Sequence, residues 1–97
     1  MPRTLSVSRA RVRPGREPEY LAAVRELARL AEGRGWHLWL FRREDDPGAF
    51  LEFSESRSRE THRAVAGRPA DERALEDRIR AVAEYEPGAW ELWEEVR

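Results

Sequence analysis

The chain contains no cysteine, no lysine, no asparagine and no glutamine. Without cysteine there are no disulfide bonds, no thiolate metal site and no cysteine nucleophile. The absence of lysine excludes a Schiff-base lysine, and catalytic asparagines are excluded as well. A catalytic group must therefore come from the remaining residue types, which include two histidines and 19 acidic residues.

Charge of one sign and long apolar runs are also missing. The net charge is −1, and acidic and basic residues are interspersed along the chain. Because no basic stripe with interleaved aromatic residues is present, we expect no nucleic-acid partner. No apolar run approaches the length of a membrane span, and the N-terminus lacks the apolar core of a signal peptide. We therefore expect no membrane partner and a cytoplasmic location.

Aromatic residues, in contrast, are plentiful. Four Trp, three Phe and two Tyr argue against disorder, although 38% of the residues are charged. A length of 97 residues predicts a single domain over residues 1–97. A domain of this size buries only a modest fraction of its surface, so association with a second copy would help to complete the core.

The spacing of the apolar residues, interrupted by proline and glycine, predicts a series of strands and helices. The predicted elements are a strand at 4–12, a helix at 18–32, strands at 36–43 and 49–55, helices at 59–66 and from about residue 70 to the EPG at 86–88, and a strand at 89–96. This order, β-α-β-β-α-β, is typical of an α+β, ferredoxin-like sandwich.

The predicted strands carry large apolar residues on both faces. In the strand that begins at Trp36, this residue, Leu38 and Leu40 share one face, whereas Trp39 and Phe41 share the other. Two helices can cover only one face of a four-stranded sheet, so the second face would stay in water unless another sheet packs on it. We therefore expect a symmetric homodimer.

Two stretches resemble a known group of proteins. The sequence RVRPGREPEYL at 11–21 is a strand exit into a helix, and FLEFSESRSRETHRA at 50–64 is a strand that runs into a histidine-bearing helix. Both are similar to the dimeric α/β-barrel superfamily, the antibiotic-biosynthesis-monooxygenase-like domains. The resemblance covers the whole chain. It implies sheets packed face to face in a dimer, with a small-molecule pocket between each sheet and its own helices.

The resemblance also implies several activities, namely cofactor-free oxidation of aromatic polyketides, haem degradation, or none that is known. Haem-degrading members use a histidine on the second helix, a tryptophan at the end of the third strand, and an asparagine. His62 could stand for the histidine, but Ser54 occupies the region of the tryptophan and the chain has no asparagine. Haem degradation is therefore not expected, and we expect no cofactor.

Three residues are candidates for catalysis. His37 could take a proton from a phenolic substrate, although a strand-start histidine bonded to backbone or water is the favoured interpretation. His62 is more often a solvated residue at a helix start than a metal ligand, and we expect no metal site. Glu52 would have a raised pKa and could act as a base if its face lines the pocket. Pairing with Arg9 or Arg11 is an equally open alternative.

Four aromatic residues, Trp36, Trp39, Tyr20 and Trp90, are candidates for stacking on a flat apolar ligand, although most such residues fill a core. Two functions follow as hypotheses. One is a cofactor-independent monooxygenase acting on a small aromatic or apolar molecule, and the other is a non-catalytic ligand-binding or stress-associated dimer. A buried His or Glu with a shifted pKa, facing an open cavity, would favour the enzyme.

Overall fold

The computed structural model describes residues 3–64 and 67–96, apart from the side chains of residues 62–64. Its elements are β1 (Thr4–Val12), α1 (Glu17–Glu32), β2 (Trp36–Arg43), β3 (Asp46–Ser56), α2 (Arg59–Ala64), α3 (Ala70–Val82), β4 (Ala83–Tyr85) and β5 (Trp93–Glu94). None of the helices in these ranges is long and apolar enough to cross a membrane.

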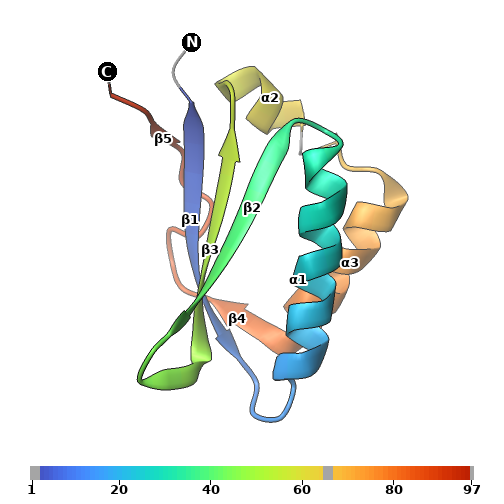
Figure 1. Cartoon of the computed structure of the whole chain (residues 1–97), viewed down its shortest axis with the longest axis vertical. Coiled ribbons are helices and arrows are strands. Elements are labelled where there is room, and N and C mark those ends of the chain that lie inside the picture. Colours follow the sequence, from blue (N-terminus) through green and yellow to red (C-terminus); the bar gives the residue numbers. More distant parts are fainter. Residues whose placement is uncertain (1–2, 65–66, 97) are drawn as a thin grey trace.

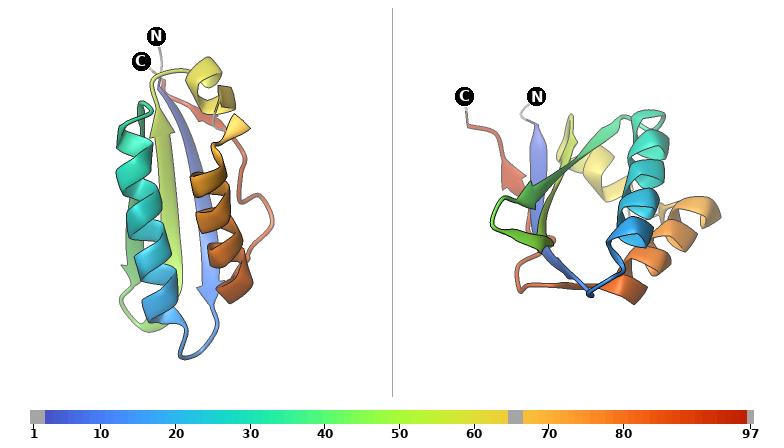
Figure 2. Two further views of the ribbon diagram at one scale, coloured as in Figure 1. Left: turned by 90° about the vertical axis from the view of Figure 1, so that its right-hand side faces the viewer. Right: turned by 60° about the horizontal axis from the view of Figure 1, so that its bottom comes forward.

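All strand pairs of the sheet are antiparallel, in the order β2-β3-β1-β4 (Figure 1). β5 pairs with the N-terminal end of β1, on the edge whose other end pairs with β4. The helices α1 and α3 lie side by side on one face of this sheet (Figure 2). The structure is therefore an α+β sandwich with a helical layer on one side, as the ferredoxin-like prediction requires.

Alternation along β1 separates the two faces of the sheet. Thr4, Ser6, Ser8, Ala10 and Val12 are buried, whereas the residues between them are half-buried or exposed. The register carries this division across the sheet, because Ser8 pairs with Glu52 and Glu52 pairs with Leu40. These residues therefore share the face that the helices cover.

The hydrophobic core lies between the helix-covered face and the apolar stripes of α1 and α3. The residues of this core are Ala10, Val12, Tyr20, Ala23, Val24, Leu27, Ala31, Trp36, Phe50, Leu75, Ile79, Val82 and Ala83. The stripe of α1 recurs at helical spacing, and Pro18 occupies its first turn, where a missing N–H costs nothing.

The other face of the sheet carries no helix. Trp39, Phe41 and Trp93 on this face are 46%, 57% and 58% exposed. The rings of Phe41 and Phe53 meet edge to face, with their centroids 5.4 Å apart. The prediction of strands with two apolar faces is thus confirmed, and this uncovered face is called the open face below.

The C-terminal region differs from its prediction. The last helix ends at Val82 rather than near 86, and residues 83–85 form β4, whose backbone groups pair with those of β1. The predicted strand at 89–96 shrinks to Trp93–Glu94, because a turn with Gly88 at a φ of +83° takes up the preceding residues. Pairing with β1 therefore overrides the local helical pattern.

The hairpin and the helix start after it differ in smaller ways. The turn between β2 and β3 is shorter than EDDPG, since β3 already begins at Asp46 and the register shifts between Arg42 and Arg43. Ser58 caps α2, because its Oγ accepts a hydrogen bond from the Thr61 N–H. The predicted end of α2 at residues 65–66 lies outside the described residues.

Replacing Phe50 by alanine should lower the free energy of unfolding by about 3–5 kcal/mol. Phe50 is 3% exposed, and its ring centroid lies 4.8 Å from that of Tyr20, so truncation leaves a void in the core. Urea denaturation would measure the change. Arg25→Ala on the exposed side of α1 is the control and should change stability by less than about 0.5 kcal/mol. A similar small change for Phe50→Ala would contradict this description of the core.

Candidate active site

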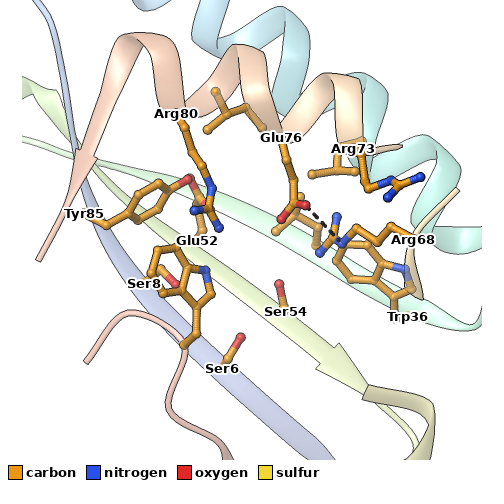
Figure 3. Close-up of a pocket in the computed structure, with 14 residues that line it drawn as sticks. Ser6, Ser8, Trp36, Glu52, Ser54, Arg68, Arg73, Glu76, Arg80 and Tyr85 are labelled. Atoms are coloured by element: carbon orange, nitrogen blue, oxygen red, sulfur yellow. Dashed lines mark hydrogen bonds and ion pairs between the residues drawn. The ribbon is translucent and has the colours of Figure 1, made fainter. Parts of the chain in front are cut away.

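A cavity of about 460 Å³ lies between the helix-covered face of the sheet and α3 (Figure 3). Its floor comes from β1, β2 and β3, and its roof from α3. Trp36 and Arg68 form one end of the cavity, and Tyr85 and Trp90 form the other. The volume falls within the usual range for small-molecule sites.

Small polar residues on the sheet explain why the cavity exists. Ser6, Ser8 and Ser54 occupy floor positions where a covered sheet face would ordinarily carry large apolar side chains. A serine fills far less of the space below the helices, so the layer stays open at this point. Ser8 also donates a hydrogen bond to the carbonyl of Ala89, which attaches the C-terminal loop to the cavity wall.

The carboxylate of Glu52 is the centre of the polar part of the cavity. The Tyr20 hydroxyl donates to its Oε2 at 2.6 Å, and the Tyr85 hydroxyl donates to the same oxygen at 2.7 Å. Tyr20 comes from α1, Glu52 from β3 and Tyr85 from β4. Neither tyrosine donates to Oε1, which accepts no hydrogen bond from any residue described in the structure.

The surroundings of Glu52 favour its protonated form. Burial raises the pKa of the Glu52 carboxyl above its ordinary value, whereas the two tyrosine hydroxyls act in the opposite direction and offset part of the rise. Burial, together with the charge of Glu52, raises the pKa of both Tyr20 and Tyr85. Both hydroxyls therefore stay protonated at neutral pH and remain donors to the carboxylate.

Three of the residues predicted as site residues line the cavity, namely Glu52, Trp36 and Trp90. Tyr20 lies behind them as a fully buried donor to Glu52. Trp90 is 56% exposed, and its ring centroid lies 5.1 Å from that of Tyr85. One end of the cavity is therefore an aromatic wall that is partly open to solvent.

The other predicted residues lie elsewhere. The side chains of His37 and Trp39 are stacked on the open face, with ring centroids 5.8 Å apart, so the sheet separates them from the cavity. His62 belongs to α2, but its side chain lies outside the described part of the structure. Glu52 forms no ion pair with Arg9 or Arg11, the alternative partners, because both arginines lie on the opposite face of the sheet and Arg11 pairs with Asp46 at 2.7 Å.

Sequence reasoning missed Arg68 and understated Tyr85. The sequence suggests that Tyr85 packs within a helix first and supplies a pocket hydroxyl second, so its contact with Glu52 could not be anticipated. Arg68 belongs to the segment between α2 and α3, and nothing in its local sequence places it in a cavity. One signal was available: the alternating serines of SVS at 6–8 and SES at 54–56 place small polar residues on the same face as the apolar residues Ala10, Val12 and Phe50.

The described side chains include no group of three or more His, Asp or Glu residues that could hold a metal ion. Flat aromatic rings and arginines dominate the two ends of the cavity. The arrangement can hold a flat organic molecule, present it to a buried carboxylate and exchange a proton with it.

Several solved structures share this fold. SnoaB, a cofactor-independent oxygenase from Streptomyces nogalater, superposes with a TM-score of 0.85 at 16% identity, over 100% of this chain and 96% of that chain. A Nitrosomonas europaea protein provisionally named an antibiotic biosynthesis monooxygenase gives 0.83 at 14% identity, over 97% and 90%. A Bacteroides thetaiotaomicron protein of unknown function gives 0.81 at 17% identity, over 96% and 97%.

These likenesses define the class of the fold. The chain has the ferredoxin-like fold of the antibiotic-biosynthesis-monooxygenase-like proteins, so the resemblance noted in the sequence is confirmed at this level. No protein-family model and no curated protein sequence matches the chain. Sequence identities of this size indicate a shared fold but do not establish a shared activity.

The Glu52→Gln variant should change how stability depends on pH. Below the ordinary carboxyl pKa of 4.5, Glu52 is neutral in both the folded and the unfolded chain. As the pH rises through the raised pKa of the folded state, the unfolded chain releases this proton first, so the wild type loses stability relative to Glu52→Gln. Urea denaturation at several values from about pH 4 to about pH 8 would measure the difference.

The matched control for this experiment is Glu84→Gln, which makes the same chemical change at an exposed position of β4. Its stability should follow that of the wild type across the series. A constant difference between the wild type and Glu52→Gln at every pH would show that the pKa of Glu52 is not raised.

Proposed function

We propose that this protein is a homodimeric, cofactor-independent monooxygenase that oxidises a small, electron-rich aromatic molecule. The observation that carries the proposal is the state of Glu52. Oε2 of Glu52 accepts hydrogen bonds from two tyrosine hydroxyls, whereas Oε1 accepts none from the residues described. Glu52 also lines the cavity of about 460 Å³. A buried carboxylate with a raised pKa has the properties of a general base near neutral pH.

The reaction begins with proton transfer. Oε1 of Glu52 removes a proton from a methylene carbon that is flanked by two aromatic rings. The tyrosine hydroxyls hold the carboxylate in place through Oε2, so the accepting oxygen does not rotate away. The product of this step is a carbanion delocalised over the ring system.

Dioxygen then reacts with the carbanion to form a carbon–oxygen bond, and the resulting peroxide anion takes its proton back from Glu52. Loss of the second C–H proton and cleavage of the O–O bond give a ketone and water. One oxygen atom stays in the product and the other leaves in the water. The methylene carbon supplies all four electrons, so no flavin, metal or external reductant is needed.

The walls of the cavity suit such a substrate. Trp36 lines one end of the cavity and Trp90 lines the other, so an aromatic ring bounds the space at each end of the floor that carries Glu52. Aromatic side chains hold flat rings by offset stacking. Burial of the substrate among these rings also keeps water from the carbanion, which would otherwise be reprotonated.

The wild-type protein should consume dioxygen when it is supplied with dihydroxyanthrone, and should form one quinone for each dioxygen consumed. Glu52→Gln should lower the rate by roughly a hundredfold to ten-thousandfold, because the amide cannot accept the proton. An oxygen electrode and absorbance of the quinone would measure the two quantities, with chelator present.

Glu84→Gln is again the matched control and should keep the full rate, because its side chain is exposed and lies outside the cavity. Binding of the anthrone without enhanced oxidation would favour the non-catalytic ligand-binding dimer. An unchanged rate in Glu52→Gln would remove Glu52 from the mechanism.

The homodimer is part of the proposal because of the open face. Monomeric proteins rarely expose a contiguous apolar patch that contains side chains as large as Trp39, Phe41 and Trp93. Charges of both signs accompany the apolar residues. Arg9 lies on this face, and Glu55 lies four residues further along the β1–β3 pair, where Arg3 of the same chain contacts it at 3.6 Å. A twofold partner with antiparallel strands would bring Arg9 toward Glu55 of the partner subunit.

The wild type should sediment at twice the chain mass of 11.4 kDa, and Phe41→Arg should sediment at the mass of one chain. Phe41 is 57% exposed, so arginine fits the isolated subunit but places a charge within the proposed interface. Arg25→Glu, on the exposed side of α1, should remain dimeric. A wild type that sediments as a single chain would contradict the dimer.

A further inference from the structure

The Arg68 end of the cavity contains hydrogen-bond donors without acceptors. Nη1 of Arg68 is buried and has no hydrogen-bond partner in the described structure. The same is true of the indole Nε1 of Trp36, whose ring lies 4.7 Å from the guanidinium carbon of Arg68. Buried hydrogen-bond donors nearly always have an acceptor, and each buried donor without one costs free energy.

Two glutamates compensate the charge of Arg68 without satisfying its donors. Nε of Arg68 lies 3.7 Å from Oε2 of Glu76, and Nη1 lies 4.0 Å from Oε1 of Glu72. Both separations exceed the length of a hydrogen bond. Glu72 is also held by Arg34 at 2.9 Å, so its carboxylate is directed to another cation.

The guanidinium group points along the cavity, toward the side of Ser54 (Figure 3). The side chain of Arg68 is only 13% exposed, and burial lowers the pKa of its guanidinium. Arg73 and Arg80 also line the cavity, as do Glu52 and Glu76, and Arg80 lies over the Trp90 ring at the opposite end. The protein therefore maintains a largely buried cation beside a space that a ligand can enter.

We propose that Arg68 binds the carboxylate group of the ligand, so that the cavity selects aromatic carboxylic acids. This inference deepens the proposed function, since it rests on a substrate whose reacting carbon lies at Glu52. A guanidinium and a carboxylate match as two parallel donors and two acceptors. The two carboxylate oxygens of the ligand accept the hydrogen bonds from Arg68 that Glu72 and Glu76 are too distant to accept.

The dimensions of the floor agree with this assignment. Trp36 pairs with Ser56, four residues along β3 from Glu52, which corresponds to roughly 13 Å at the rise of a strand. The carboxylate and the reacting carbon of the ligand would therefore be separated by its ring system. Ser6 and Ser54 lie between the two ends and place small side chains beneath the rings.

Two isosteric probes test the inference, anthraquinone-2-carboxylate and anthraquinone-2-carboxamide. Isothermal titration calorimetry should show that the wild type binds the acid about ten- to a hundredfold more tightly than the amide, the range of a charge-assisted hydrogen bond. Arg68→Met should abolish this preference for the acid. Arg68→Lys should retain part of it, since lysine keeps the positive charge but lacks the two parallel N–H donors of a guanidinium group. Arg25→Met is the control and should bind as the wild type does.

Equal affinity of the wild type for the acid and the amide would overturn the inference, and this comparison needs no variant to fold. A preference that survives in Arg68→Met would also overturn it and would transfer the role to Arg73 or Arg80. In the wild type, the indole N–H resonance of Trp36 should shift with the acid and much less with the amide. Because these are binding measurements, a protein that selects the acid but consumes no dioxygen would retain this inference and lose the proposed activity.

Discussion

The carboxylate of Glu52, held by two tyrosine hydroxyls, is the interaction on which the site depends. Burying a carboxylate is costly unless donors replace the lost water, and Tyr20 and Tyr85 supply two donors at 2.6 and 2.7 Å. The three residues come from α1, β3 and β4, so the same contacts join the helical layer to two strands. Loss of either hydroxyl would affect both the pKa of the carboxyl group and the position of the elements that surround it.

Alternation along the strands accounts for both the cavity and the open face. On the covered face, serines replace apolar residues and leave a cavity, and Glu52 enters that cavity from the middle of β3. On the open face, Trp39 and Phe41 remain in water in the isolated chain. A shift of one residue in the register of β2 or β3 would exchange the two sets of side chains, and neither the cavity nor the apolar face would survive.

Much of this architecture could be predicted from the sequence. The apolar stripe of α1, the strands with two apolar faces and the ferredoxin-like order follow from periods of 3.6 and 2 residues, which are local properties. Glu52 could be named as a candidate, but whether it met Arg11 or a cavity could not be decided. The contacts of Arg68 could not be predicted either, because they depend on how the segment before α3 crosses Trp36.

The sequence by itself determined which side chains are available. The chain lacks cysteine and lysine, is rich in arginine and tryptophan, and has strands with two apolar faces. Only the tertiary structure decided which of these groups meet. Glu52 lies 32 residues from Tyr20 and 33 from Tyr85, and the contact with Tyr85 exists because residues 83–85 leave the helical pattern to pair with β1. Local periodicity reflects interactions between residues that are close in the sequence, whereas strand register and packing bring distant residues together. The arrangement of this site arises from strand register and packing.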